Sequence, residues 1–150
     1  CSNPLAKENL KKEAKCRGVN PKRLIFAEFM TIEKHLGRLT FGDLALDTFN
    51  VNGHTTTSDA IRSGLPVLTL LGKSFTSRVS ASLLTAIDVP ELITYNKKQY
   101  EDKALELASN NKKLAILKKK LVKAKGNSAL FNSELFTMNL EEKFMELINK

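Results

Sequence analysis

Several residue types that build common functional sites are scarce in this chain. Its 150 residues include two cysteines, Cys1 and Cys16, two histidines and no tryptophan. Two such cysteines do not make a disulfide framework, and they lack the clustered Cys/His spacing of a metal site. No run approaches the roughly 18–20 apolar residues that cross a bilayer, and the lysine-rich start lacks the apolar segment of a signal peptide. We therefore predict a cytoplasmic protein with no metal and no membrane contact.

Three widespread motifs are also missing. There is no G-x-G-x-x-G dinucleotide fingerprint and no G-x-S-x-G nucleophile elbow. Gly72-Lys73-Ser74 resembles the end of a phosphate-binding P-loop, but Val67 stands where that loop requires its first glycine. The sequence thus excludes these three kinds of site.

Positive charge is concentrated in one segment. The net charge is +8, and residues 97–125 hold ten lysines against three acidic residues. A nucleic-acid site would need aromatic platforms or an arginine that reads bases, but this segment has only Tyr100 and no arginine. We therefore predict no nucleic-acid partner and interpret the lysines as solvated helix faces.

Short apolar runs alternate with helical periodicity over about the first 95 residues. The pattern predicts helices at 3–17, 31–38, 55–63 and 77–87. It predicts buried strands at 23–26, 43–47 and 67–71, and a short strand at 91–94. Apolar strands separated by such helices favour a parallel sheet covered on both faces. The predicted fold class is α/β, a Rossmann-like parallel sheet with flanking helices.

The rest of the chain is predicted to be a helical tail. Helices are expected at 97–109, 111–125 and about 133–149. The last one carries an apolar stripe at i+4 spacing, which we expect to pack rather than to bind a ligand. The members of this stripe are Phe136, Leu140, Phe144 and Ile148.

At this length we expect a single domain over residues 1–150, with an α/β part at about 1–95 and a helical part at about 96–150. The chain starts with Cys1 instead of Met, so we expect it to be a truncated piece of a longer polypeptide.

The most promising site follows the second predicted strand. There Asn52-Gly53-His54-Thr55-Thr56 leads into a helix, and Asp59 lies about one turn further on. A helix N-terminus offers unpaired N–H groups and partial positive charge to a phosphate. His54 could donate to a diphosphate oxygen, and Asp59 could bind a hydroxyl-bearing group. Spacing alone supports an ordinary capped helix equally well.

A second pair of candidates lies on the short helix at 31–38. His35 and Arg38 are three residues apart, so both can face one side of that helix. Taken alone, a histidine in this position is more often structural than functional.

An ordered series of motifs resembles the C-terminal catalytic lobe of the O-linked N-acetylglucosamine transferases, glycosyltransferase family 41, particularly its bacterial members with tetratricopeptide repeats. The similarity runs from about residue 9 to residue 149, and the order of its motifs is more specific than any one of them. Those motifs are Arg23–Phe26, Glu33–Leu36 with Arg38, Asp43–Thr48, Asn52–Thr56, Ser58–Ala60, Gly64–Thr69, Ser77–Leu84 and Leu130–Asn132.

This resemblance implies a UDP-sugar-binding lobe of a GT-B glycosyltransferase, which moves N-acetylglucosamine from UDP-N-acetylglucosamine to serine or threonine of proteins. It implies that the His54–Thr56 run cradles the diphosphate and that Asp59 helps to hold the nucleotide. It places His35 at the uracil side, with Arg38 beside it. UDP is the leaving group, so donors aimed at the diphosphate would stabilise charge that grows in the transition state.

The resemblance also implies that this chain holds only part of the active site. The animal members carry an Ala-Pro-Lys run whose lysine reaches the nucleotide, and this chain has Met30-Thr31-Ile32 instead. The lysine that neutralises the diphosphate, the acceptor-binding lobe and the repeats would all lie outside this chain. No catalytic residue is therefore assigned, and the isolated chain is expected to be inactive.

Two other functions stay open. The chain could be a non-catalytic α/β module that binds an acidic partner through its lysine-rich helices. It could also belong to a GT-B transferase that uses another nucleotide sugar, and the sequence does not separate that possibility from the first.

Overall fold

The computed structural model describes residues 3–149, and they divide after His35 into two compact units. The first unit holds α1 (Pro4–Cys16), the 3-10 turn η1 (Pro21–Arg23) and the start of α2 (Ile32–Leu39). The side chain of Asn3 caps α1 by accepting a hydrogen bond from the amide of Ala6 at 3.3 Å. The helices predicted at 3–17 and 31–38 are thus confirmed, while Ser2, the other candidate cap, lies outside the described residues.

The strand predicted at 23–26 is wrong. Arg23 ends η1, and residues 24–31 form no regular structure. The side chain of Ile25 is 91% exposed, and Phe26 is only half-buried, with the ammonium of Lys11 lying 5.9 Å from its ring centre. A short apolar run becomes a strand only where another strand pairs with it and a surface covers its side chains. The described part of the first unit contains no strand that could do so.

The second unit is built on a three-stranded parallel sheet in the order β1-β2-β3. The strands are β1 (Ala45–Leu46), β2 (Val67–Leu70) and β3 (Ile93–Thr94). They confirm the strands predicted at 43–47, 67–71 and 91–94, although each is shorter than predicted. β1 is not the buried strand expected, because Leu46 is 59% exposed. Because all three strands are parallel, their carboxyl ends lie at one edge of the sheet, and the segments that follow them meet there.

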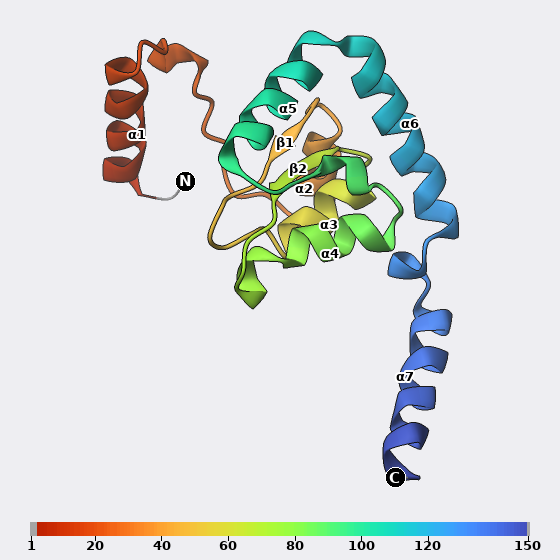
Figure 1. The fold of residues 1–150 in the computed structure, drawn as a ribbon. Helices are drawn as coiled ribbons and strands as arrows, with labels where there is room; N and C mark the ends of the chain where they lie inside the picture. Colours follow the sequence, from red (N-terminus) through yellow and green to blue (C-terminus); the bar gives the residue numbers. More distant parts are fainter. Residues whose placement is uncertain (1–2, 150) are drawn as a thin grey trace. The chain divides into compact units, whose positions relative to one another are not determined.

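Helices cover both faces of this sheet, as the α/β prediction requires. Figure 1 shows α5 (Lys97–Ser109) above the strands, with α3 (Thr55–Arg62) and α4 (Val79–Ala86) below them. All three helices contact β2. Gly64, with φ at +78°, ends α3 as predicted, because a residue with a side chain would be strained there. The helix predicted at 77–87 is confirmed as α4, which begins two residues later than predicted and follows the turn η2 (Phe75–Ser77).

The hydrophobic core joins the sheet to the helical part of the chain. Leu68 of β2 and Leu84 of α4 are fully buried. Leu107 of α5 and Leu121 of α6 (Asn111–Asn127) belong to the same buried cluster. The turn η3 (Pro90–Leu92) adds Leu92 to this cluster. The first two helices of the predicted tail therefore pack on the sheet.

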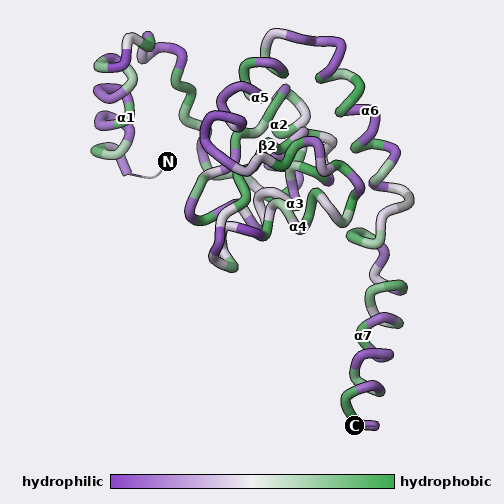
Figure 2. The backbone as a smooth tube through the Cα atoms, in the orientation of Figure 1, coloured by the Kyte–Doolittle hydropathy of each residue, from purple (hydrophilic) through white to green (hydrophobic). Residues whose placement is uncertain are grey.

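The last helix, α7 (Ser133–Ile148), has no buried residue within the described chain. It follows the turn η4 (Ala129–Phe131), and Figure 2 shows apolar residues recurring along it. The stripe expected to pack is exposed: Phe136 by 62%, Phe144 by 54% and Ile148 by 76%. The helix itself is confirmed, but no surface among residues 3–149 covers its stripe. None of the helices in this range is both long and apolar enough to cross a membrane.

Candidate functional site

The loop from Asp47 to His54 connects the carboxyl end of β1 to the first turn of α3. The Asp47 carboxylate holds this loop closed. Its Oδ1 accepts hydrogen bonds from the amides of Thr48 at 2.9 Å and Gly53 at 2.7 Å. Its Oδ2 accepts one from the hydroxyl of Thr69, on β2, at 2.7 Å. One side chain thus joins both ends of the loop to the central strand.

Tyr100, on α5, holds the same loop from the other side. Its hydroxyl donates to the backbone carbonyl of Asp47 at 3.0 Å. The ring of Phe49 packs edge-on against the Tyr100 ring, with 5.1 Å between the ring centres. Burial, together with the negative charge of Asp47, raises the pKa of Tyr100 to about 12.

This shift predicts a stability change at high pH. The pKa of Tyr100 is higher in the folded chain than its usual value near 10, so its stabilising contribution is complete below pH 10 and is lost as pH rises through 12. We expect Tyr100→Phe to remove the part of the stability loss at high pH that comes from Tyr100, which amounts to about 3 kcal/mol at most. Urea unfolding at several pH values between 9 and 12 measures it. The same slope in the wild type and the variant would contradict the assignment.

The start of α3 is packed tightly against Gly53. A Cβ at this glycine would lie 2.6 Å from the hydroxyl oxygens of Thr56 and Thr57, closer than real Cβ atoms come. The carbonyl of Gly53 accepts a hydrogen bond from Ser80, on α4, at 2.9 Å, and the same hydroxyl lies 2.9 Å from that of Thr57. Thr57 and Ser80 are buried. The loop and the first turn of α3 are therefore fixed to α4.

Four of the predicted site residues come together on α3. His54 is the N-cap residue, and it is exposed, with its ring edge-on to that of Phe75 at 6.1 Å. Thr55 and Thr56 are exposed in the first turn, and Asp59 is half-buried one turn on. Among residues 3–149, no side chain caps this helix start, and its first turn contains no acidic residue. The amides there can donate to an anion.

The other two predicted residues lie together on α2. His35 and Arg38 are both half-buried, and the division between the two units falls between them. Leu39, which follows Arg38 in the chain, lines a hollow of about 270 Å³ together with Thr48 and Thr56. Within the second unit, the end of α2 and the start of α3 therefore border one hollow.

A second hollow lies at the carboxyl ends of the strands. Its volume is about 330 Å³, and each of the three strands contributes the residues that follow it. Lys73 and Lys97 line it, and the ammonium of Lys97 lies 5.9 Å from the ring centre of Phe49. The loop from Asp47 to His54 thus borders both hollows, and two lysines line the second one.

The Gly72-Lys73-Ser74 segment, which its sequence excludes as a P-loop, has a structural role instead. A Cβ at Gly72 would lie 2.1 Å from the hydroxyl oxygen of Ser77. The amide of Ser74 donates to that same hydroxyl at 3.1 Å. The segment therefore packs against its own turn η2.

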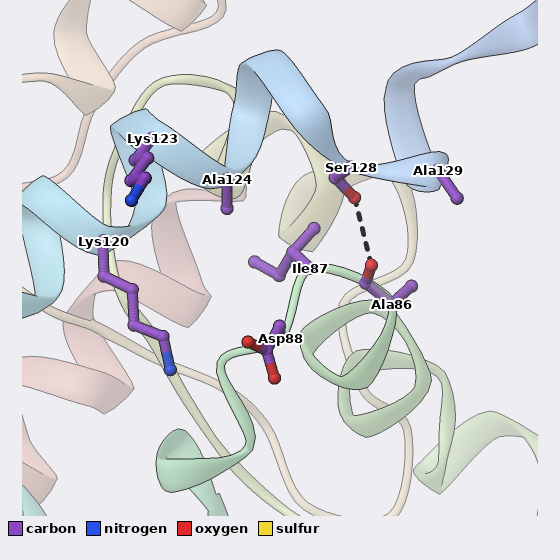
Figure 3. A pocket seen from close by; sticks show the side chains of 8 residues that line it. All are labelled: Ala86, Ile87, Asp88, Lys120, Lys123, Ala124, Ser128 and Ala129. Atoms are coloured by element: carbon purple, nitrogen blue, oxygen red, sulfur yellow. Dashed lines mark hydrogen bonds between the residues drawn. The ribbon is translucent and has the colours of Figure 1, made fainter.

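The cavity in Figure 3 is separate from these residues. It has a volume of about 400 Å³, lies between the end of α4 and the end of α6, and contains none of the predicted site residues. Across it, the hydroxyl of Ser128 donates to the carbonyl of Ala86 at 3.0 Å. Lys120, on its wall, pairs with Glu91 at 2.9 Å.

Part of the lysine charge on α6 is paired within the chain. Lys118 pairs with Asp43 at 2.9 Å, and Lys113 pairs with Glu106. These ion pairs agree with the interpretation of the lysines as solvated helix faces.

Sequence reasoning missed the residues that hold the site. Asp47 was assigned only to a strand and to a family motif, while Ser80 and Tyr100 received no role. A carboxylate directly after a buried strand was the one available signal, because side chains at that position face the edge where ligands bind.

Comparisons with known proteins give a consistent result. Residues 3–140 match the model of glycosyl transferase family 41. The chain is 33% identical over 135 residues to a UDP-N-acetylglucosamine–peptide N-acetylglucosaminyltransferase of Caenorhabditis elegans. It is 34% identical over 137 residues to a protein of Arabidopsis thaliana named as the probable transferase SEC. The structure also matches that of a Thermobaculum terrenum O-GlcNAc transferase mutant, K341M, with a TM-score of 0.87 and 30% identity.

These matches cover nearly all of this chain but little of the relatives. They include 90% and 91% of this chain, but only 12% of the nematode protein and 14% of the plant protein. The match to the bacterial structure covers 95% of this chain and 27% of that one.

Proposed function

Because the chain belongs to glycosyl transferase family 41, we propose that it forms part of the donor site of a protein O-GlcNAc transferase and holds the diphosphate of UDP-N-acetylglucosamine at the start of α3. The observation that carries this proposal is the exposed start of α3, with His54 as its N-cap residue and no acidic residue in its first turn. The likeness to named N-acetylglucosaminyltransferases supports the choice of donor.

The chemistry follows from these groups. Amides and hydroxyls of Thr55 and Thr56, together with the imidazole of His54, donate hydrogen bonds to the diphosphate oxygens. Negative charge on the UDP leaving group grows as the bond to the sugar breaks, so the same donors stabilise the transition state more than the bound donor. Asp59 holds a hydroxyl of the nucleotide, and His35 and Arg38 contact the nucleoside.

The remaining parts of the reaction belong to the parent protein. In this proposal the acceptor serine or threonine, the lysine that neutralises the diphosphate and the tetratricopeptide repeats all lie outside this chain. The reaction takes place in the cytoplasm and needs no metal. The chain alone binds the donor weakly and transfers no sugar.

Titration of UDP into the ¹⁵N-labelled chain tests the proposal. We expect the amides from Gly53 to Asp59 to shift first, because the diphosphate accepts hydrogen bonds from them. Uridine, which has no phosphate, is the matched ligand control and should leave the amides from Gly53 to Thr56 unchanged. His54→Ala should weaken the UDP response several-fold, by the loss of one hydrogen bond to a charged group. No shift at Gly53–Asp59 up to several millimolar UDP contradicts the proposal.

The same titration separates the other two functions. A module that binds an acidic partner through the lysines of 112–125 would ignore UDP and bind that partner with steep salt dependence. A transferase that uses another nucleotide sugar would still respond to a diphosphate at α3. A donor screen with the full-length parent protein distinguishes that case.

A further inference from the structure

We propose that Asp47 is the positioning residue of the donor site, because its carboxylate closes the 47–54 loop and thereby sets the direction of the amides at the start of α3. This inference rests on the proposed function. It assigns no contact between Asp47 and the donor itself.

The hydrogen bonds of Asp47 are spread over both of its oxygens. Oδ1 accepts from the amides of Thr48 and Gly53, at 2.9 and 2.7 Å. Oδ2 accepts from Thr69 at 2.7 Å. Hydrogen bonds to an ionised carboxylate are stronger than neutral ones. Thr69 is fully buried in β2, so the carboxylate fixes the loop to the central strand of the sheet.

Gly53 links the Asp47 carboxylate to the first turn of α3. Its amide donates to Asp47 at 2.7 Å, and its carbonyl accepts from Ser80 at 2.9 Å. Hydrogen bonds thus hold the peptide groups on both sides of Gly53. Thr55, which carries the first amide of the helix, is only two residues further on. A rotation at Gly53 would turn the amides of Thr55 and Thr56 away from the diphosphate.

Other hydrogen bonds hold the middle of the loop. The hydroxyl of Thr48 donates to the carbonyl of Val51 at 2.5 Å, and the amide of Asn52 donates to the carbonyl of Thr76 at 2.8 Å. Oδ1 of Asn52 is buried and has no hydrogen-bond partner among residues 3–149, which costs the closed loop free energy. The Asp47 bonds offset that cost.

The change in UDP affinity when the Asp47 carboxylate is removed distinguishes a positioning role from a direct electrostatic effect of its charge. A carboxylate 2.7 Å from the Gly53 amide places negative charge beside a site proposed for an anion. If the charge alone mattered, removing it would strengthen UDP binding. If positioning matters, removing the carboxylate weakens UDP binding, although repulsion falls at the same time. Asparagine at this position keeps an acceptor for the Gly53 amide and can donate to the Thr69 hydroxyl, so it preserves the loop without the charge.

UDP titrations of Asp47→Ala and Asp47→Asn, followed by the ¹⁵N shifts of Gly53–Asp59, test this inference. We expect Asp47→Ala to weaken UDP binding about tenfold and Asp47→Asn to stay within about threefold of the wild type. Asp43→Ala is the matched control, because it removes an exposed carboxylate from the segment before β1, and its UDP affinity should stay within about twofold.

Each outcome has one meaning. Wild-type affinity or tighter binding in Asp47→Ala, in a chain with an otherwise native spectrum, overturns the positioning role but leaves the proposed function intact. Absence of a UDP response in the wild type contradicts the proposed function itself. If Asp47→Ala does not fold, Thr69→Val removes a single hydrogen bond to the carboxylate with little change of shape. It should weaken UDP binding about threefold, and an unchanged affinity there overturns the inference as well.

Discussion

Replacing Gly53 by alanine is expected to weaken UDP binding more than tenfold and to lower the free energy of unfolding by about 2 kcal/mol. The new methyl group would lie 2.6 Å from the hydroxyl oxygens of both Thr56 and Thr57. Thr57 is buried and lies within hydrogen-bonding distance of Ser80, so it has no free space into which to move. The first turn of α3 must therefore shift, and the proposed diphosphate donors shift with it. UDP titration and urea unfolding of the same samples measure both effects.

Gly126→Ala provides the matched control for this substitution. Gly126 lies within α6, and a Cβ there would meet no atom within 4 Å. Alanine favours the helix over glycine, so this variant should gain up to about 1 kcal/mol of stability and keep its UDP affinity. The two glycine substitutions therefore have opposite signs. Unchanged UDP affinity in Gly53→Ala would show that the packing at Gly53 does not set the geometry of the site.

The local arrangement of the candidate site could be predicted from the sequence, but the contacts that hold it could not. The order of buried run, glycine, threonines and helix is local, and His54, Thr55, Thr56 and Asp59 lie on α3 where that order places them. The supports come from distant residues. Asp47 and Thr69 are 22 residues apart, and Tyr100 lies 53 residues from its partner. No local spacing reveals such pairs, because the sheet brings them together only when its strands align.

Gly53 shows how a residue of the candidate site can have a structural role that the sequence does not indicate. From the sequence, a glycine before a helix permits a tight turn or the close approach of a ligand. In the structure the space of its missing side chain is filled by the threonine hydroxyls of its own helix. The side chains that a Cβ at Gly53 would meet belong to Thr56 and Thr57, three and four residues ahead. Their positions depend on their rotamers, which the sequence does not specify.

The strands were predictable where an apolar run in the sequence also has a neighbouring strand to pair with in the structure. The runs at 43–47 and 67–71 are β strands because they pair with each other in parallel, and helices cover the strand in the second run. The run at 23–26 has similar apolar character but no neighbouring strand among residues 3–35, and it does not form one. The apolar stripe of α7 has the right helical period, but periodicity does not name the surface that covers it. Patterning identifies an apolar face, and the partner of that face depends on the rest of the fold.

Leu121→Ala and Ile116→Ala test whether the helical part and the sheet unfold as one unit. Both residues lie on α6, but Leu121 is 1% exposed in the core cluster that includes Leu68 of β2, whereas Ile116 is 65% exposed. We expect Leu121→Ala to cost about 3 kcal/mol through lost burial and the remaining cavity, and Ile116→Ala to cost less than about 0.5 kcal/mol.

The decisive measurement for this pair is amide hydrogen exchange resolved by residue. Since the core joins α6 to β2, Leu121→Ala should lower the protection of amides in both elements by the same free energy. The Gly53 amide, which donates to Asp47, should lose the same amount of protection. Loss of protection confined to α6 would show instead that this helix opens independently of the sheet. The 47–54 loop would then depend on the sheet, α4 and α5 alone, and substitutions in α6 would leave UDP binding unchanged.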